Sequence, residues 1–257
     1  MNDTAILEAK ALRRVYQRSD GESTEILKGI DLEIRRGEFA AVMGQSGSGK
    51  STLLYCISGM DRISGGSVVY DGRELHTLSD DEISRIRLTS MGFVFQQSYM
   101  LGDFTIKENI MLPALKAGKI SKKQAERRAL ESMERVGIAH VADSDITQVS
   151  GGQLQRAAIC RALINQPAVL FADEPTGALN SGATEEIMEI FGQVNGAGTT
   201  IVMVTHDVKV AARADRVIYL EDGRLGQEYR FGKSDAAALR TRETELLEWL
   251  TGNGFCA

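Results

Sequence analysis

Two stretches of the 257-residue chain contain residues whose types and spacing could bind and cleave a phosphate chain. The first stretch, residues 44–51, has the pattern G-x-x-x-x-G-K-S. Glycines let a backbone wrap around an anion with its N–H groups pointing inward, the lysine adds a point charge, and the serine hydroxyl can bind Mg²⁺. The pattern therefore predicts a loop that holds the phosphates of a nucleotide. The residues expected to contact the nucleotide here are Gly44, Ser46, Gly47, Ser48, Gly49, Lys50, Ser51 and Thr52.

The second stretch is an apolar run, residues 169–172, that ends in the carboxylates of Asp173 and Glu174. Ligands of open α/β sheets bind at the carboxyl ends of the strands, so both carboxylates would face a bound nucleotide. Asp173 suits the shell of a Mg²⁺ ion, usually through water, and Glu174 could take a proton from an attacking water molecule. Taken alone, the pair could also be a capping pair at a strand end.

The elements around these residues read as a mixed α/β protein. A short apolar strand, residues 38–43, leads into the glycine-rich loop, and a helix, residues 50–58, follows it. Strands that alternate with helices predict a parallel sheet covered on both faces. Further strands are expected at 168–172, 200–204 and 216–220, and helices at 106–115, 122–136 and 151–164.

The two ends of the chain read differently from the middle. Residues 5–9 and 12–16 predict two short strands, and alternating apolar residues predict another strand within 26–34. At the other end, Ser234 is a plausible N-cap for a helix over residues 234–250. The apolar residues expected to share one face of that helix are Leu239, Leu246, Leu247 and Leu250.

The composition of the chain argues against several classes of protein. The chain is 43% hydrophobic and 25% charged with a formal net charge of −5, which does not suggest a nucleic-acid partner. Its three cysteines are far apart, and Cys56 and Cys160 lie in apolar helical patterns, as expected in a reducing cytoplasmic setting. The N-terminus lacks signal-peptide features, and the apolar runs are far shorter than the ~18 residues of a membrane span. We therefore expect action at a membrane only through a partner.

Residues 149–153, Val-Ser-Gly-Gly-Gln, followed by Leu-Gln-Arg, resemble the LSGGQ signature of ABC ATPases, and the other motifs occur in the order typical of that family. The resemblance covers about residues 4–225. It implies a P-loop NTPase (RecA-like) core with an N-terminal antiparallel β subdomain and an inserted α-helical subdomain. The ATPase domain would span 1–232, with the core at about 1–95 and 166–232, the helical subdomain at about 96–165, and a helical extension at 233–257.

The resemblance also implies roles for single residues. The signature residues Ser150, Gly151, Gly152 and Gln153 would bind the γ-phosphate of ATP held by the P-loop of a second copy. Two copies would then pair head to tail around ATP and Mg²⁺.

Three further residues receive roles from the resemblance. Gln96 resembles the Q-loop glutamine, which senses Mg²⁺ and contacts a transmembrane partner, and His206 resembles the switch histidine near the γ-phosphate. Tyr16 resembles the aromatic residue that stacks on adenine. The implied Mg²⁺ ligands are Ser51, Gln96 and Asp173, and the implied catalytic residues are Glu174, His206 and Gln96.

Two positions depart from the family pattern. Val149 stands where the signature has leucine, a small change of volume that we expect to be tolerated. Asn180 ends Gly-Ala-Leu-Asn where the D-loop of the family has aspartate. Asparagine keeps the shape but removes a charge and adds NH₂ donors, which puts the coupling between subunits in question.

Residues 171–179 and 92–97 resemble the branch of lipoprotein-release, macrolide-export and peptide-detoxification ATPases (the MacB, LolD and BceA types). This implies a subunit at the cytoplasmic face of the membrane that powers a separate permease, with antimicrobial-peptide export or detoxification as the first expectation. A lipoprotein-release ATPase and an FtsE-like regulator of a cell-wall machine remain open. A chromosome-structure ATPase would need a long coiled coil where only about 54 positions (150 − 96) separate Gln96 from Ser150. A translation-associated protein of the family normally has two cassettes, and this chain has one.

Overall fold

The computed structural model describes residues 4–17, 21–233 and 238–252, which form two compact units. The first unit consists of Met1–Ile83 and Asn195–Ala257, and the second of Ser84–Val194. Helices α2 (Asp80–Ser90) and α6 (Ser181–Gly196) each run across a boundary between them. The helical subdomain expected at residues 96–165 lies within the second unit.

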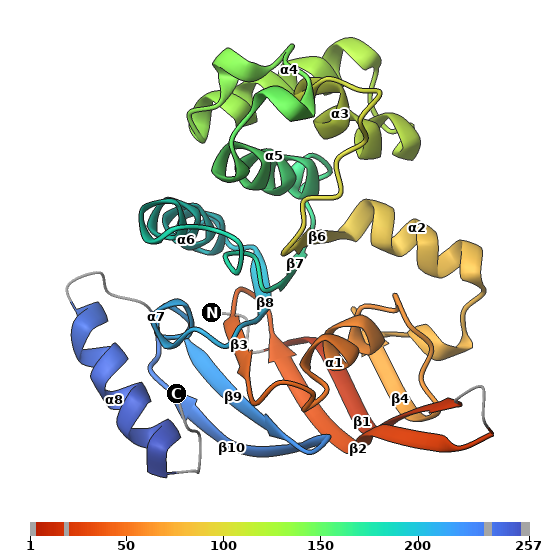
Figure 1. The fold of residues 1–257 in the computed structure, drawn as a ribbon. Coiled ribbons are helices and arrows are strands. Elements are labelled where there is room, and N and C mark those ends of the chain that lie inside the picture. Colours follow the sequence, from red (N-terminus) through yellow and green to blue (C-terminus); the bar gives the residue numbers. More distant parts are fainter. Residues whose placement is uncertain (1–3, 18–20, 234–237, 253–257) are drawn as a thin grey trace. The chain divides into compact units, whose positions relative to one another are not determined.

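An antiparallel sheet forms the N-terminal part of the first unit (Figure 1). The two short strands expected near the N-terminus are one strand, β1, because a bulge rather than a turn separates them. The pairing register shifts between Ala9 and Leu12, and Ala11 has a φ of 46° while its N–H donates to Asp31 Oδ1 over 2.8 Å. The strand order is β2-β1-β4-β5, with β1 Ala5–Gln17, β2 Ser23–Arg35, β4 Gly65–Tyr70 and β5 Arg73–Glu74.

The other strands of the first unit lie in the order β10-β9-β3-β8. β3 (Phe39–Met43) is buried at every position and pairs in parallel with both β8 (Thr200–Val204) and β9 (Arg216–Glu221). An apolar strand without alternation is typical of a sheet covered on both faces. β10 (Arg224–Arg230) pairs antiparallel with β9. The helices of this unit include α1 (Lys50–Ile57), directly after the glycine-rich loop, and α7 (Val208–Ala211) after β8.

The C-terminal helix α8 (Leu239–Gly252) is anchored to the first unit by a buried arginine. The guanidinium of Arg242 donates to the carbonyl oxygens of Lys233, Gly232 and Ala214 over 2.7, 3.0 and 3.3 Å. Leu246 and Leu250 are fully buried, whereas Leu247 is 43% exposed, so the four leucines expected on one face do not all pack. The proposed N-cap at Ser234 lies outside the described residues.

The second unit contains two parallel strands, β6 (Met91–Phe95) and β7 (Val169–Asp173), and a layer of helices. These helices are α3 (Ile106–Ala117), α4 (Lys122–Arg135) and α5 (Gly151–Leu163), with short 3₁₀ turns at Ala139–Val141 and Ile146–Gln148. Each helix begins with a capping box, in which a Ser or Thr side chain and a Glu or Gln three residues later satisfy each other's backbone N–H groups.

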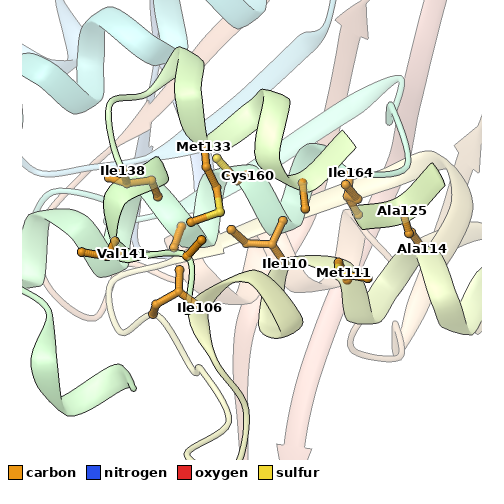
Figure 2. Packing of buried hydrophobic residues seen from close by; sticks show 13 residues of the cluster. Ile106, Ile110, Met111, Ala114, Ala125, Met133, Ile138, Val141, Cys160 and Ile164 are labelled. Atoms are coloured by element: carbon orange, nitrogen blue, oxygen red, sulfur yellow. The ribbon is translucent and has the colours of Figure 1, made fainter. Parts of the chain in front are cut away.

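The three helices enclose a common apolar core (Figure 2). Ile106, Ile110 and Met111 from α3 meet Met133 from α4 and Ile164 after α5 in this core. Each fully buried aliphatic side chain contributes about 1.5–3 kcal/mol relative to exposure, so the core is large enough to order the helices that carry the signature segment. Among the described residues, no helix has both the length and the apolar character needed to cross a lipid bilayer.

Candidate active site

The phosphate loop connects the carboxyl end of β3 to the first turn of α1. Its conformation needs glycine at both ends: a Cβ on Gly44 would lie 2.1 Å from the carbonyl oxygen of Leu220, and Gly49 caps α1 with a φ of 101°. No other residue type fits these positions without strain. The loop thus reaches the N-terminus of α1, where backbone N–H groups and the helix dipole favour an anion.

Two side chains of this loop suit a bound phosphate. Lys50 Nζ donates to the carbonyl oxygens of Gly44 and Gln45, each over 2.9 Å, which folds its ammonium group back over the loop. The buried Ser48 Oγ has no hydrogen-bond partner among the described residues. Because a buried hydroxyl normally has a partner, this donor fits a loop shaped for an acceptor such as a phosphate oxygen.

The ring of Tyr16, at the end of β1, is held on one face and at its hydroxyl. Arg14 lies over the ring at 4.2 Å from its centroid, and Tyr16 donates its hydroxyl proton to Asp61 Oδ2 over 2.5 Å. Arg14 also pairs with Asp61 at 2.8 Å. Burial and the bond to Asp61 raise the pKa of Tyr16, so it stays protonated at neutral pH. The Tyr16 residue is 37% exposed, so part of its surface is accessible to a base.

His206 follows β8 on the same sheet edge as the phosphate loop. Val42 of β3 pairs with Val204 of β8 in parallel register, and Thr205 N donates to Val42 O over 3.2 Å. The strand ends that precede the loop and His206 are therefore neighbours within the first unit. His206 immediately precedes Asp207, whose carboxylate caps α7.

Gln96 and Glu174 directly follow the two paired strands of the second unit. Phe95, the last residue of β6, pairs with Asp173, the last residue of β7, and each predicted site residue is the next one along. A Cβ added to Gly177 would lie 2.9 Å from Gln96 Nε2, so the chain after Glu174 passes against the Gln96 side chain. Asp173 is 8% exposed.

Glu174 has a φ of 47°, in the left-handed region that side chains other than glycine rarely adopt. The residue is followed by Pro175, and a residue before proline favours extended conformations. Strained backbone of this kind persists only where the surroundings hold it, and it is common at functional sites.

The signature segment forms the N-terminus of α5. Ser150 is the N-cap: its Oγ accepts from Gln153 N, and its own N–H donates to Gln153 Oε1 over 2.8 Å. Gln153 Nε2 lies 3.2 Å from His140 Nε2. Gly151 is exposed, so the positive end of this helix is open to an anion.

Asn180, the departure in the D-loop, is the N-cap residue of α6. Its Oδ1 accepts from Ala183 N over 2.9 Å, and its carbonyl oxygen accepts from Thr184 N. Asparagine and aspartate are about equally good N-caps, so the departure preserves the local structure.

A groove of about 390 Å³ lies beside Gln96 within the second unit. Tyr99 and Leu101, in the segment after Gln96, are 64% and 50% exposed. The backbone of that segment is fixed from α5, where Arg161 donates to the carbonyl oxygens of Ser98 and Tyr99. The groove is lined by Gln96, Gln97, Ser98, Tyr99, Met100, Ile146, Gly151, Leu154, Gln155, Ala178 and Leu179.

The predicted site residues are thus divided between the units. Tyr16, residues 44–52 and His206 belong to the first unit, and Gln96, residues 150–153, Asp173 and Glu174 to the second. The implied Mg²⁺ ligands Ser51, Gln96 and Asp173 all offer oxygen atoms, the donors that Mg²⁺ prefers together with phosphate oxygens and water.

Two residues that hold parts of this site have no role predicted from the sequence. Asp61 lies outside the recognised motifs, and it binds the Tyr16 hydroxyl. Gln155 lies in the Leu-Gln-Arg segment quoted after the signature, where no role was predicted for it, and it binds the backbone beside Gln96 and Glu174. The sequence does contain a signal for Gln155: it is a polar residue on the apolar face of a predicted helix, which indicates a buried hydrogen bond.

The fold and the phosphate loop define a P-loop nucleoside triphosphatase. The model of the ABC transporter family matches residues 27–177, more than half of the chain, so the chain belongs to that family. The sequence is 43% identical over 222 residues to the macrolide export ATP-binding/permease protein MacB of Escherichia coli (strain K12), and 44% identical over 221 residues to MacB of Aggregatibacter actinomycetemcomitans. Each match covers 86% of this chain and 34% of the relative, so the chain spans about a third of the length of these MacB proteins.

Solved structures of ATP-binding cassettes share the fold. The dimeric cassette MJ0796 in a post-hydrolysis state with ADP and Pi is 39% identical, with a TM-score of 0.82, and the match covers 89% of this chain and all of that one. The protein cbiO1 of Clostridium perfringens, part of the ABC transporter complex cbiONQ, is 29% identical, with a TM-score of 0.79, and the match covers 96% of this chain and 94% of that one. The predictions of a P-loop fold, of a MacB-like ABC ATPase and of ATP hydrolysis are confirmed by these matches.

Proposed function

We propose that the chain is the ATP-hydrolysing subunit of an ABC transporter that pairs with a second copy of itself and drives a membrane permease. The observation that carries this proposal is the presence of two helix N-termini suited to an anion, at α1 and at α5, each in a different unit. In a head-to-tail pair, ATP bound at the loop before α1 of one copy would meet Ser150 and Gly151 of the other. The dimeric state of the related cassette MJ0796 supports this arrangement.

Hydrolysis in such a pair needs a metal ion and a base. The Ser51 hydroxyl and the Gln96 side chain would hold a Mg²⁺ ion directly and Asp173 would hold it through water, and the bound ion would supply positive charge that stabilises the reacting phosphates. The Glu174 carboxylate takes a proton from water as the water oxygen attacks the γ-phosphorus, and ADP leaves. His206 orients the γ-phosphate, and Tyr16 stacks on the adenine. These assignments remain predictions.

The groove beside Gln96 is the proposed docking surface for the permease. Its lining is largely apolar, and the adjoining Tyr99, Leu101 and Phe104 side chains are all more than a third exposed. Apolar side chains grouped around a groove mark a binding surface for an apolar helix of a partner. Through that partner, the subunit would work at the cytoplasmic face of a membrane.

The transported compound is proposed to be a membrane-associated antimicrobial compound, with an antimicrobial peptide as the first expectation. The related MacB proteins are named for macrolide export, which supports an export role for the branch. The test is to delete the gene and challenge the cells with bacitracin, nisin and erythromycin. Greater sensitivity to the peptides supports the proposal, and greater sensitivity to erythromycin alone favours a macrolide. Unchanged sensitivity to all three would leave lipoprotein release or cell-wall regulation.

The docking surface has its own test in Tyr99→Glu, with Leu115→Glu as the matched control. Leu115 lies in α3, is 40% exposed and does not line the groove. We expect the Tyr99 variant to lose co-purification with the permease and the Leu115 variant to keep it. Equal recovery of the permease with both variants would contradict the docking assignment.

A further inference from the structure

One buried amide connects the two strand ends that carry Gln96 and Glu174. Gln155 lies in α5, two residues after the signature segment, and is 3% exposed. Its Nε2 donates to Phe95 O over 2.9 Å and to Pro175 O over 2.7 Å. Phe95 immediately precedes Gln96, and Pro175 immediately follows Glu174. A single NH₂ group therefore binds the backbone next to both residues.

The backbone that this amide binds is strained. Glu174 has a left-handed φ of 47° and precedes a proline, a combination that an isolated chain would avoid. The carbonyl of Pro175 lies directly after that strained residue, and the bond from Gln155 fixes it. The turn that follows is closed by Gly177 N donating to Glu174 O over 3.1 Å.

Packing alone does not explain an amide at this position. The other buried residues of α5 are Ala157, Ala158, Ile159 and Cys160, so Gln155 is the polar member of an otherwise apolar face. Burying an amide is unfavourable unless its hydrogen bonds are made, and a leucine or methionine would fill the same volume. Gln155 also lines the groove beside Gln96.

We propose that Gln155 is a positioning residue, which sets the backbone of Gln96 and Glu174 for hydrolysis and links both to the groove where the permease would bind. The proposal rests on the proposed roles of Gln96 and Glu174. Gln155 itself touches neither nucleotide nor water in this role. A partner that enters the groove would contact Gln155 or its neighbours, and a shift of this side chain would move the backbone beside Glu174.

The first test replaces Gln155 by methionine, which keeps the length of the side chain and removes both hydrogen bonds. In the full chain with MgATP, we expect kcat to fall about tenfold, because losing the two buried hydrogen bonds weakens the hold on the active backbone geometry. KM and the dissociation constant for ATP should change by less than about twofold, because the phosphate loop lies in the other unit. The amide protons of Gly177 and Leu179, which close the turns after Glu174, should exchange faster.

Asn165 provides the matched control. Its Nδ2 also donates to two backbone carbonyls of the second unit, Leu88 O at 2.8 Å and Pro113 O at 3.1 Å, and neither adjoins a predicted site residue. Asn165→Leu should lower the melting temperature about as much as Gln155→Met while leaving kcat unchanged. If both variants lose kcat in proportion to their loss of stability, Gln155 has only a structural role and the proposal is wrong.

Gln155→Glu is the second variant and covers the case in which the methionine variant folds poorly. A carboxylate of the same shape cannot donate to the two carbonyl oxygens, but its protonated form can donate to one. Burial among acceptors raises the pKa of such a carboxyl, so the ratio of variant to wild-type kcat should rise as pH falls from about 8 to about 6. A ratio independent of pH would contradict the proposal.

The same measurements separate this inference from the proposed function. If the wild type hydrolyses ATP and Lys50→Ala does not, the proposed function holds whatever happens at Gln155. If the wild type hydrolyses no ATP, the exchange rates of the Gly177 and Leu179 amides still report whether Gln155 holds that backbone. Unchanged exchange in Gln155→Met would then overturn the inference alone.

Discussion

In the first unit, the glycines and the lysine of the phosphate loop lie within eight consecutive residues, whereas in the second unit the backbone beside Gln96 and Glu174 is held from far along the chain. Gln155 is 60 positions from Phe95 and 20 from Pro175, the two residues whose carbonyls it binds. A local site depends on its own glycines and lysine. A site assembled from distant segments depends on the packing of its whole unit, so it can also respond when a partner moves part of that unit.

The largest effect should come from breaking the local site. Lys50→Ala removes the charge that faces the phosphates, so ATP affinity should fall by about 100-fold, as for the loss of hydrogen bonds to a charged group. Equilibrium binding of a fluorescent ATP analogue measures this loss. Lys10→Ala is the control, because Lys10 is a surface lysine of the same unit that pairs with Glu8. Wild-type affinity in the Lys50 variant would remove the phosphate-loop assignment.

The second effect should separate binding from chemistry. Glu174→Gln cannot accept a proton from water, so kcat should fall by about 100-fold or more while ATP affinity is kept. Because ATP is then not consumed, light scattering should show a dimer that forms only with ATP. Glu131→Gln, at an exposed residue of α4 that pairs with Arg127, should behave as wild type. Hydrolysis at the wild-type rate in Glu174→Gln would count against Glu174 as the base.

The third effect tests whether the signature acts on a second copy. Ser150→Arg should prevent the ATP-dependent dimer of the Glu174→Gln background without weakening ATP binding to the monomer. Ser121→Arg is a close control, because Ser121 and Gln124 form the same capping box at α4. Each change should destabilise the chain by about 1 kcal/mol through loss of the cap, but only the Ser150 change should abolish the dimer. Loss of the dimer in both variants would show that the cap, and not the signature, matters.

The contrast between a local site and a site held by distant residues also explains what the sequence could predict. The residues from Gly44 to Ser51 were recognisable because their role follows from local backbone geometry. Around the β1 bulge at Ala11, the sequence pattern predicts two separate strands, because an extra residue in a ladder has no clear local signal. Leu247 was expected to pack, but the face that α8 buries is set by Arg242 reaching back to distant carbonyls.

Gln155 shows most clearly what could not be predicted from the sequence. Its position after the signature was visible, but its two acceptors, Phe95 O and Pro175 O, become neighbours only when β6, β7 and α5 pack together. Neither strand pairing nor the left-handed backbone of Glu174 is encoded in a local pattern. The chemistry of the site was therefore predictable from motifs, and the means of holding it in place was not.

The smallest effect should come from Asn180→Asp, which restores the residue usual in the family's D-loop. Asn180 caps α6 through its Oδ1, and aspartate offers the same acceptor, so the free energy of unfolding should change by less than about 0.5 kcal/mol. The first unit, which contains the phosphate loop, is not altered, so the affinity for ATP should also stay the same. Only turnover should change, because the substitution replaces NH₂ donors by a negative charge on a segment expected at the junction between two copies. Steady-state ATPase assays beside thermal unfolding measure both quantities. Equal turnover in the two forms would show that the departure has no effect on hydrolysis, and a change in ATP affinity without one in turnover would contradict a role at the junction.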